Sequence, residues 1–146
     1  MNKIKYTLTL LFGLAILSST SQAQCDADKH KNQCVAQLAD GYTFIKSYLL
    51  NDGKLNGSGE IEYSFVFSSG TTYMLTFANA LGASENIEIK LFDPNKKLLA
   101  SNHDKKSGRF FPIGYKCKAT GVHYMTFKFV ENTDVCGLSV LGFKRG

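Results

Sequence analysis

The stretch EIEYSFVFSSGTTYMLTFAN, residues 60–79, decides the fold because its large apolar side chains recur at every second position. That period is the period of a β-strand with one buried face. The pattern breaks at Ser68-Ser69-Gly70, where small residues and a glycine indicate a turn. In residues 61–67 the side chains on the expected buried face are aromatic or aliphatic, and residues 71–79 show the same alternation. Two half-buried strands joined by a turn are therefore predicted.

The same reasoning, extended along the chain, predicts six further strands. They fall at residues 42–50, 86–93, 98–101, 109–115, 121–130 and 135–143. Pro112 indicates an edge or a bulge in its strand, apolar groups on both faces of residues 121–130 indicate a central strand, and residues 135–143 are expected to complete a final hairpin. Strands at this spacing predict an all-β fold, an antiparallel jelly-roll-like β-sandwich of roughly seven or eight strands with a short N-terminal helical segment.

Residues 1–23 have the three parts of an export signal. Lys3 and Lys5 form a positive start, residues 8–17 are apolar, and small residues precede the expected cleavage point after Ala23. We therefore expect a secreted or periplasmic protein.

What remains, residues 24–146, has the length of a single domain. Gln24 is too bulky and polar for lipoprotein processing at Cys25. The apolar run of the signal is also too short for a stable transmembrane anchor. No lipid or membrane attachment is expected.

Residues 26–39 predict one short helix, whole or broken, that ends at Asp40-Gly41. Asp26 and Asp28 favour its start, because acidic groups are stabilising near a helix N-terminus. Val35 and Leu38 are spaced to share a buried face.

Four cysteines follow the signal, and an even number in an exported chain predicts disulfides. Our first expectation is that nearest neighbours pair, Cys25 with Cys34 and Cys117 with Cys136. The first pair requires a turn, because nine residues of straight helix rise about 13.5 Å whereas disulfide Cα atoms lie within about 7 Å. The alternative is that the two N-terminal cysteines attach their segment to the sheet through the other two. No CxxC or CxxH spacing supports zinc.

No metal site or cofactor is predicted elsewhere either. Asp52 and its neighbours depart from the EF-hand pattern at Lys54 and Tyr63, and a looser calcium site remains an alternative. The net charge of +5 comes from scattered lysines, with short pairs at residues 96–97 and 105–106. A nucleic-acid partner is not expected, because such proteins carry a basic stripe with interleaved aromatics.

The segment LFDPNKKLLASNHD, residues 91–104, contains a strong turn at Asp93-Pro94 and ends on His103-Asp104. Catalysis by such a pair needs a base oriented by an acid and a nucleophile within reach. Adjacent side chains in a loop point apart, and no GxSxG turn is present. We therefore predict no catalytic residues and a chain that is not an enzyme. The candidate binding loops comprise Asp93, Asn95, Asn102, His103, Asp104 and Arg109.

Three segments resemble the bacterial pre-peptidase C-terminal (PPC) domain and related small jelly-roll modules of exported proteins. They are IEYSFVFSSGTTYMLTF, IEIKLFDPNKKLLASN and GVHYMTFKF, which lie between Gly59 and Lys128. The resemblance implies a jelly-roll fold and a non-catalytic accessory or binding role. Such modules usually accompany a catalytic domain, whereas here the module is nearly the whole mature chain and adds four cysteines.

Three hypotheses for the function follow. The first is an exported module that binds a protein or a glycan, at a loop end or through tyrosines exposed on a sheet face rather than packed in the core. The second is a small hydrolase, in which His103 or His123 meets a carboxylate and a hydroxyl in a cleft. The third is a structural envelope protein that self-associates through a long uncovered edge strand.

Overall fold

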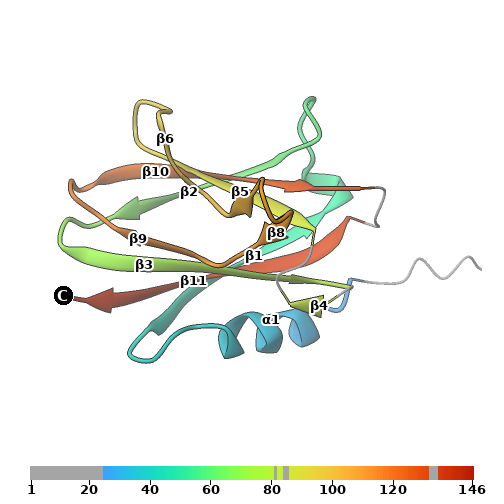
Figure 1. The fold of residues 1–146 in the computed structure, drawn as a ribbon, viewed down its shortest axis with the longest axis horizontal. Helices are drawn as coiled ribbons and strands as arrows, with labels where there is room; N and C mark the ends of the chain where they lie inside the picture. The colour runs from blue at the N-terminus through green and yellow to red at the C-terminus, as the bar shows by residue number, and fades with distance from the viewer. Residues whose placement is uncertain (1–24, 81, 84–85, 132–134) are drawn as a thin grey trace, which may run out of the picture.

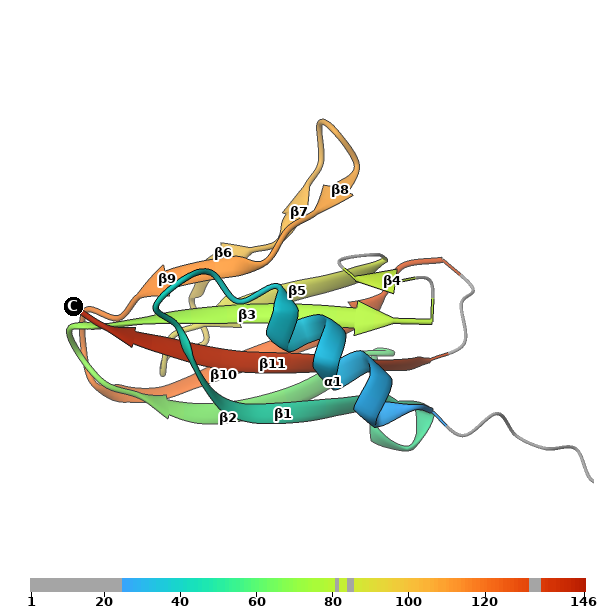
Figure 2. The ribbon, with the colours of Figure 1, turned by 90° about the horizontal axis from the view of Figure 1, so that it is seen from below.

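The computed structural model describes residues 25–80, 82–83, 86–131 and 135–146, and the predicted export signal lies outside them. Two antiparallel sheets pack face to face, and one helix covers the outer face of one sheet (Figures 1 and 2). The predicted all-β sandwich is confirmed. No helix of the described part has the length and apolar character needed to cross a membrane.

Eight strands of four or more residues, counted over the described residues, form the sandwich. They are β1 (Thr43–Asn51), β2 (Ile61–Phe67), β3 (Thr71–Asn79), β5 (Ile87–Phe92), β6 (Leu98–Ser101), β9 (Ile113–Lys116), β10 (Gly121–Phe129) and β11 (Cys136–Arg145). Three two-residue strands, β4 (Gly82–Ala83), β7 (His103–Asp104) and β8 (Arg109–Phe110), and the 3-10 helix η1 (Asp52–Lys54) complete the described elements besides the helix.

The strand order is that of a jelly roll. One sheet, called sheet A here, has the order β1-β11-β3. The other edge of β3 pairs with β9 along its first half and with β4 at its end. The other, sheet B, has the order β2-β10-β5-β6. The chain crosses between the sheets at nearly every connection, as in an eight-stranded double Greek key. The expected final hairpin is wrong, because β10 and β11 lie in different sheets and β11 pairs with β1 and β3.

The core follows the alternation seen in the sequence. In β2 the buried positions are Ile61 and Phe67, and Glu62 and Ser64 face solvent. The Phe67 ring stacks on Tyr73 of β3, with 4.0 Å between centroids, and thereby joins the two sheets. β10 is central in sheet B, as its two apolar faces predicted. Aromatic residues thus fill the space between the sheets.

Pro112 divides the strand that was predicted for residues 109–115. Proline has no N–H to donate to a ladder, and the segment forms β8 before it and β9 after it. The first piece pairs with β7 instead of with either sheet. β7 and β8 thus form a small separate hairpin, and the strand predicted for residues 109–115 is split between this hairpin and sheet A.

The helix α1 (Ala27–Ala36) forms at the predicted place. The Asp26 carboxylate caps it by accepting a hydrogen bond from Lys29 N. Its buried face holds His30 and Cys34, whereas Val35 is 39% exposed. The predicted apolar face was therefore wrong at Val35, because the helix turns a histidine and a cysteine toward sheet A.

The nearest-neighbour disulfides are also wrong. Cys25 is bonded to Cys136 at the start of β11, and Cys34 and Cys117 are buried free thiols. Cys25 and Cys34 cannot approach because α1 is unbroken between them. Cys117 lies beside Thr71, at the opposite end of β3 from Cys136. The alternative pairing is confirmed in part. One disulfide, and not two, attaches the N-terminal segment to sheet A.

Candidate functional site

Residues 102–111 form a hairpin that stands away from the sandwich beside β6 and β9 (Figure 2). Its two short strands pair His103 with Phe110 and Asp104 with Arg109. Four of the six predicted binding residues lie in this hairpin, which we call the β7–β8 hairpin. It is the most prominent projection of the described part (Figure 2).

The tip of the hairpin is held by Asp104. Its carboxylate accepts hydrogen bonds from Ser107 Oγ at 2.7 Å and Lys106 N at 2.9 Å. Gly108 takes the left-handed conformation, with φ of +67°, and donates its N–H to the Asp104 carbonyl. The Ser107 hydroxyl, and after it the Lys106 N–H, lower the pKa of the Asp104 carboxyl group. The carboxylate is therefore ionised and supports the turn.

The exposed charge of the hairpin is positive. Lys105, Lys106 and Arg109 are all exposed. Within the described ranges, no carboxylate lies at ion-pair distance from any of these three side chains. With Asp104 counted, the hairpin carries a net charge of about +2 near neutral pH. A cationic, projecting tip results.

Asn102 joins the hairpin to the sandwich. It is 4% exposed. Its Oδ1 accepts a hydrogen bond from Ile89 N at 2.6 Å, and its Nδ2 donates to the Ile87 carbonyl at 2.8 Å. Its own carbonyl accepts from Phe111 N, at the other base of the hairpin. Its side-chain amide is therefore bonded to β5 and fixes the base of the hairpin, and its binding role stays a prediction.

A hollow of about 400 Å³ lies at the base of the hairpin, between residues 100–104 and residues 111–114. The His103 ring stacks on Phe110, with 4.6 Å between centroids, and stiffens one of its walls. Phe111, on the other side, leaves 48% of its surface exposed. The site therefore combines a cationic tip, an exposed aromatic ring and a concave base.

Asp93 and Asn95 lie elsewhere, in the turn between β5 and β6. The Asp93 carboxylate accepts hydrogen bonds from the N–H groups of Asn95 and Lys97, both at 2.8 Å. This turn and the hairpin lie at opposite ends of β6, a strand whose four residues span about 13 Å. The structure therefore does not bring the two predicted loops together.

The β5–β6 turn is folded back onto sheet B. Lys96 Nζ lies 3.4 Å from the centroid of the Tyr124 ring and 2.8 Å from Glu62 Oε2. Tyr48 and Tyr73 are core residues, and Tyr124 lies under Lys96. Tyr48 and Tyr73 therefore pack in the core rather than in an exposed patch, and Tyr124 is covered by Lys96.

The two histidines considered for hydrolysis have different surroundings. His123 is buried, stacks on Phe67 at 4.7 Å and bonds the Gly121 carbonyl through Nδ1. His103 stacks on Phe110, while the neighbouring Asp104 carboxylate bonds Ser107 and Lys106. Neither imidazole has a hydrogen bond to both a carboxylate and a hydroxyl among the described residues.

Two long strands lie at sheet edges, and one of them, β1, is interrupted, whereas β2 of sheet B pairs with β10 in unbroken register. β1 lies at the edge of sheet A. Its register with β11 shifts between Phe44 and Lys46, which leaves Ile45 as an extra residue. A bulge and an edge lysine are features that discourage edge-to-edge pairing.

No protein-family model and no curated protein matches the chain. Two solved structures have a similar fold. One is PliG from Aeromonas hydrophila, a periplasmic inhibitor of g-type lysozyme, with 17% identity over 74% of this chain and 92% of that chain and a TM-score of 0.45. The other is the pre-peptidase C-terminal domain of a collagenase from Bacillus anthracis, with 18% identity over 70% of this chain and 89% of that chain and a TM-score of 0.45.

Proposed function

We propose that the chain is an exported, non-catalytic module that binds a protein partner by placing the β7–β8 hairpin into an acidic depression of that partner. Export is supported by the predicted signal and by the Cys25–Cys136 disulfide, since such bonds persist in oxidising compartments. The observation that carries the proposal is the projecting hairpin with its cationic tip.

The hairpin is built to keep its shape without a partner. Asp104 supports the turn, the His103–Phe110 stack supports the arms, and Asn102 anchors the root. A preformed element loses little conformational freedom on binding, and this raises affinity.

The shape and chemistry favour a protein over a glycan. The hairpin is convex, so it fits a concave surface, whereas the hollow at its base receives a ridge of the partner. Arginine and aromatic side chains contribute most to protein interfaces, and Arg109 and Phe111 supply one of each. The uncompensated lysines favour an acidic partner and would accelerate association at low salt.

Site-specific cross-linking in cells that produce the protein tests the proposal. A photo-reactive benzophenone residue replaces Lys106 at the tip, and in a matched control it replaces Lys118, beyond the far end of β9. We expect one saturable protein adduct from the tip position and none from the control. Mass spectrometry then identifies the partner.

Binding of the purified partner to the purified module gives the quantitative test. Lys105→Glu with Lys106→Glu should weaken binding by about tenfold or more, equal to about 1.4 kcal/mol. The charge-matched control, Lys116→Glu with Lys118→Glu, should change the dissociation constant by less than about threefold. The affinity of the unsubstituted module should fall as salt is raised.

Three outcomes would contradict the proposal. Equal effects of the two charge swaps would show that only net charge matters. A homo-adduct would favour self-association. Retention on immobilised alginate or chitin that the hairpin variant abolishes, without a protein adduct, would favour a glycan.

A further inference from the structure

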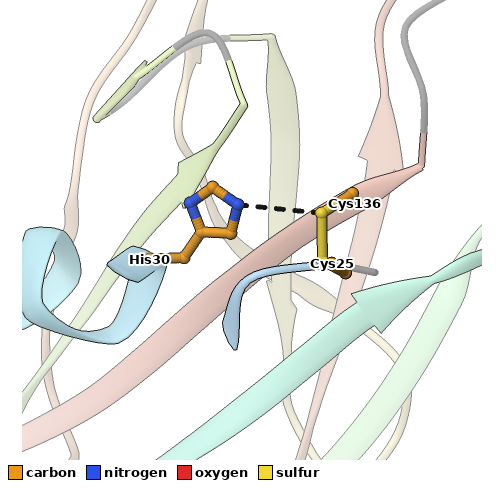
Figure 3. A group of neighbouring side chains, drawn as sticks. All are labelled: Cys25, His30 and Cys136. Atoms are coloured by element: carbon orange, nitrogen blue, oxygen red, sulfur yellow. Dashed lines mark hydrogen bonds between the residues drawn. A yellow bond between two sulfur atoms is a disulfide. The ribbon is translucent and has the colours of Figure 1, made fainter. Parts of the chain in front are cut away.

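A second group of chemically active side chains lies at the start of α1, on sheet A. It consists of Cys25, His30 and Cys136, which we call the Cys–His cluster (Figure 3). Their sulfur and ring-nitrogen ligand atoms all lie within 4.8 Å of one another. His30 comes from α1, Cys25 precedes the helix, and Cys136 begins β11. None of these residues belongs to the hairpin.

The His30 ring is oriented by its neighbour in the helix. Nδ1 lies 3.3 Å from Gln33 Oε1, which can accept a hydrogen from it. Nε2, on the other side of the ring, lies 3.7 Å from Cys136 Sγ (Figure 3). With the hydrogen on Nδ1, Nε2 has the lone pair that a metal ligand needs. His30 is 4% exposed, whereas Cys25 and Cys136 are partly exposed.

We propose that reduction of the Cys25–Cys136 bond converts the Cys–His cluster into a Zn²⁺ site with two thiolates and one imidazole. A dithiol reductant transfers two electrons and two protons to the bond and is itself oxidised to a disulfide. Two thiols form, and Zn²⁺ binding then releases their two protons. The bound species is a Cys₂His centre, a ligand set typical of zinc.

The required movement is small. Two sulfurs that share a tetrahedral zinc ion, each about 2.3 Å from it, lie about 3.8 Å apart. The two Cα atoms are 5.3 Å apart, so side-chain rotation can open the sulfurs to that separation while the helix stays in place. The helix is also held by Cys34, whose buried Sγ donates to the Leu138 carbonyl. A ligating histidine commonly donates its other N–H to an acceptor, which is the role of Gln33.

The remaining cysteines do not complete the site. Burial raises the pKa of Cys34 to about 12, so this thiol does not ionise readily. Cys117 lies beside Thr71 at the far end of β3 and bonds the Ala119 carbonyl. Three protein ligands leave the fourth position of the ion for water or another small ligand, as in open zinc sites.

Titration with Co²⁺ and Zn²⁺ tests the inference on the full mature chain. The background is Cys34→Ser with Cys117→Ala, which removes both other thiols and keeps a donor for the Leu138 carbonyl. A phosphine that does not bind these ions reduces the protein. We expect one Co²⁺ per reduced chain, with thiolate-to-metal absorption, displacement by Zn²⁺ and release of about two protons per ion. The oxidised protein should bind none.

Substitutions identify the ligands. His30→Ala should weaken Zn²⁺ binding by more than a hundredfold. Gln33→Leu should weaken it by about ten- to a hundredfold, because the ligating imidazole loses the acceptor for its other N–H. His103→Gln, which removes a histidine of the hairpin, should leave binding unchanged. Circular dichroism verifies that each reduced variant is folded, and Zn²⁺ should raise the melting temperature of the reduced parent but not of His30→Ala.

Failure of the folded, reduced parent to bind Zn²⁺ with 1:1 stoichiometry would overturn the inference. So would binding that survives His30→Ala unchanged. The hairpin experiments are done on the oxidised protein, so either result is independent of the proposed function.

Discussion

Helix α1 and the β7–β8 hairpin are both additions to the eight-stranded sandwich, and the chain holds them in different ways. The helix packs its His30–Cys34 face on sheet A and is closed by a disulfide. The hairpin projects and is attached only at its base, by the bonds of Asn102 to β5 and by the packing of Phe110 against the core, while Asp104 bonds Ser107 within it. We infer from this difference that the helix contributes to the stability of the domain, whereas the hairpin is free to contact another molecule.

Removal of the covalent attachment should have the largest effect. The Cys25–Cys136 bond closes a loop of sequence separation 111, and a loop of that size restricts the unfolded chain by about 4 to 5 kcal/mol. Cys25→Ala with Cys136→Ala should lower the free energy of unfolding by about that amount in urea titrations. Cys117→Ala, which removes a thiol that takes part in no disulfide, serves as the control. A loss below about 1 kcal/mol would show that burial of α1 suffices by itself.

Substitution of Asn102 at the base of the hairpin should have the second largest effect on stability. Asn102→Ala leaves Ile89 N and the Ile87 carbonyl without their side-chain partner in a buried strand. Unpaired buried groups of this kind should cost about 2 to 3 kcal/mol of unfolding free energy. Asn95→Ala is the matched control in an exposed turn and should cost less than about 0.5 kcal/mol. Equal effects would mean that Asn102 does not anchor the hairpin.

The fold could be predicted where a local pattern determines it. Alternation in residues 61–67 and 71–79 indicates a strand whatever the partner strand is, because a sheet buries one face of each. The Asp93-Pro94 turn is likewise a property of four adjacent residues. For these elements the prediction and the structure agree.

The rest depends on residues that are far apart in the chain. Asn102 resembles any loop asparagine until β5 is placed beside it, and Cys25 meets Cys136 only after the N-terminal segment lies on sheet A. His30 and Cys34 form no apolar stripe, so the buried face of α1 gave no signal in the sequence. The Cys–His cluster was missed for the same reason: its ligands come from three separate segments.

Loss of the aromatic stack between the two strands of the hairpin should change the protease resistance of the hairpin alone. His103→Ala removes the stack on Phe110, and aromatic pairs contribute about 1 kcal/mol beyond burial. Trypsin cleavage at Lys105 and Lys106 should accelerate roughly fivefold. His103→Phe keeps a ring and should retain resistance. Cleavage in α1, at Lys29 and Lys31, should not change, and if it accelerates equally the hairpin is not an independent unit.

Acidification should have the smallest effect and should act on the hairpin tip alone. The pKa of Asp104 is lowered in the folded chain because Ser107 and Lys106 donate to its carboxylate. The stabilisation is therefore complete above the unfolded pKa, which is about 3.9, and is lost as the pH falls through the lower folded value. Amide NMR shifts of Lys106 and Ser107 should report this transition. They should be independent of pH in that range for Asp104→Asn, whereas amides of α1 should be unaffected by that substitution. A Lys106 shift that titrates identically in both proteins would show that the tip does not depend on this carboxylate.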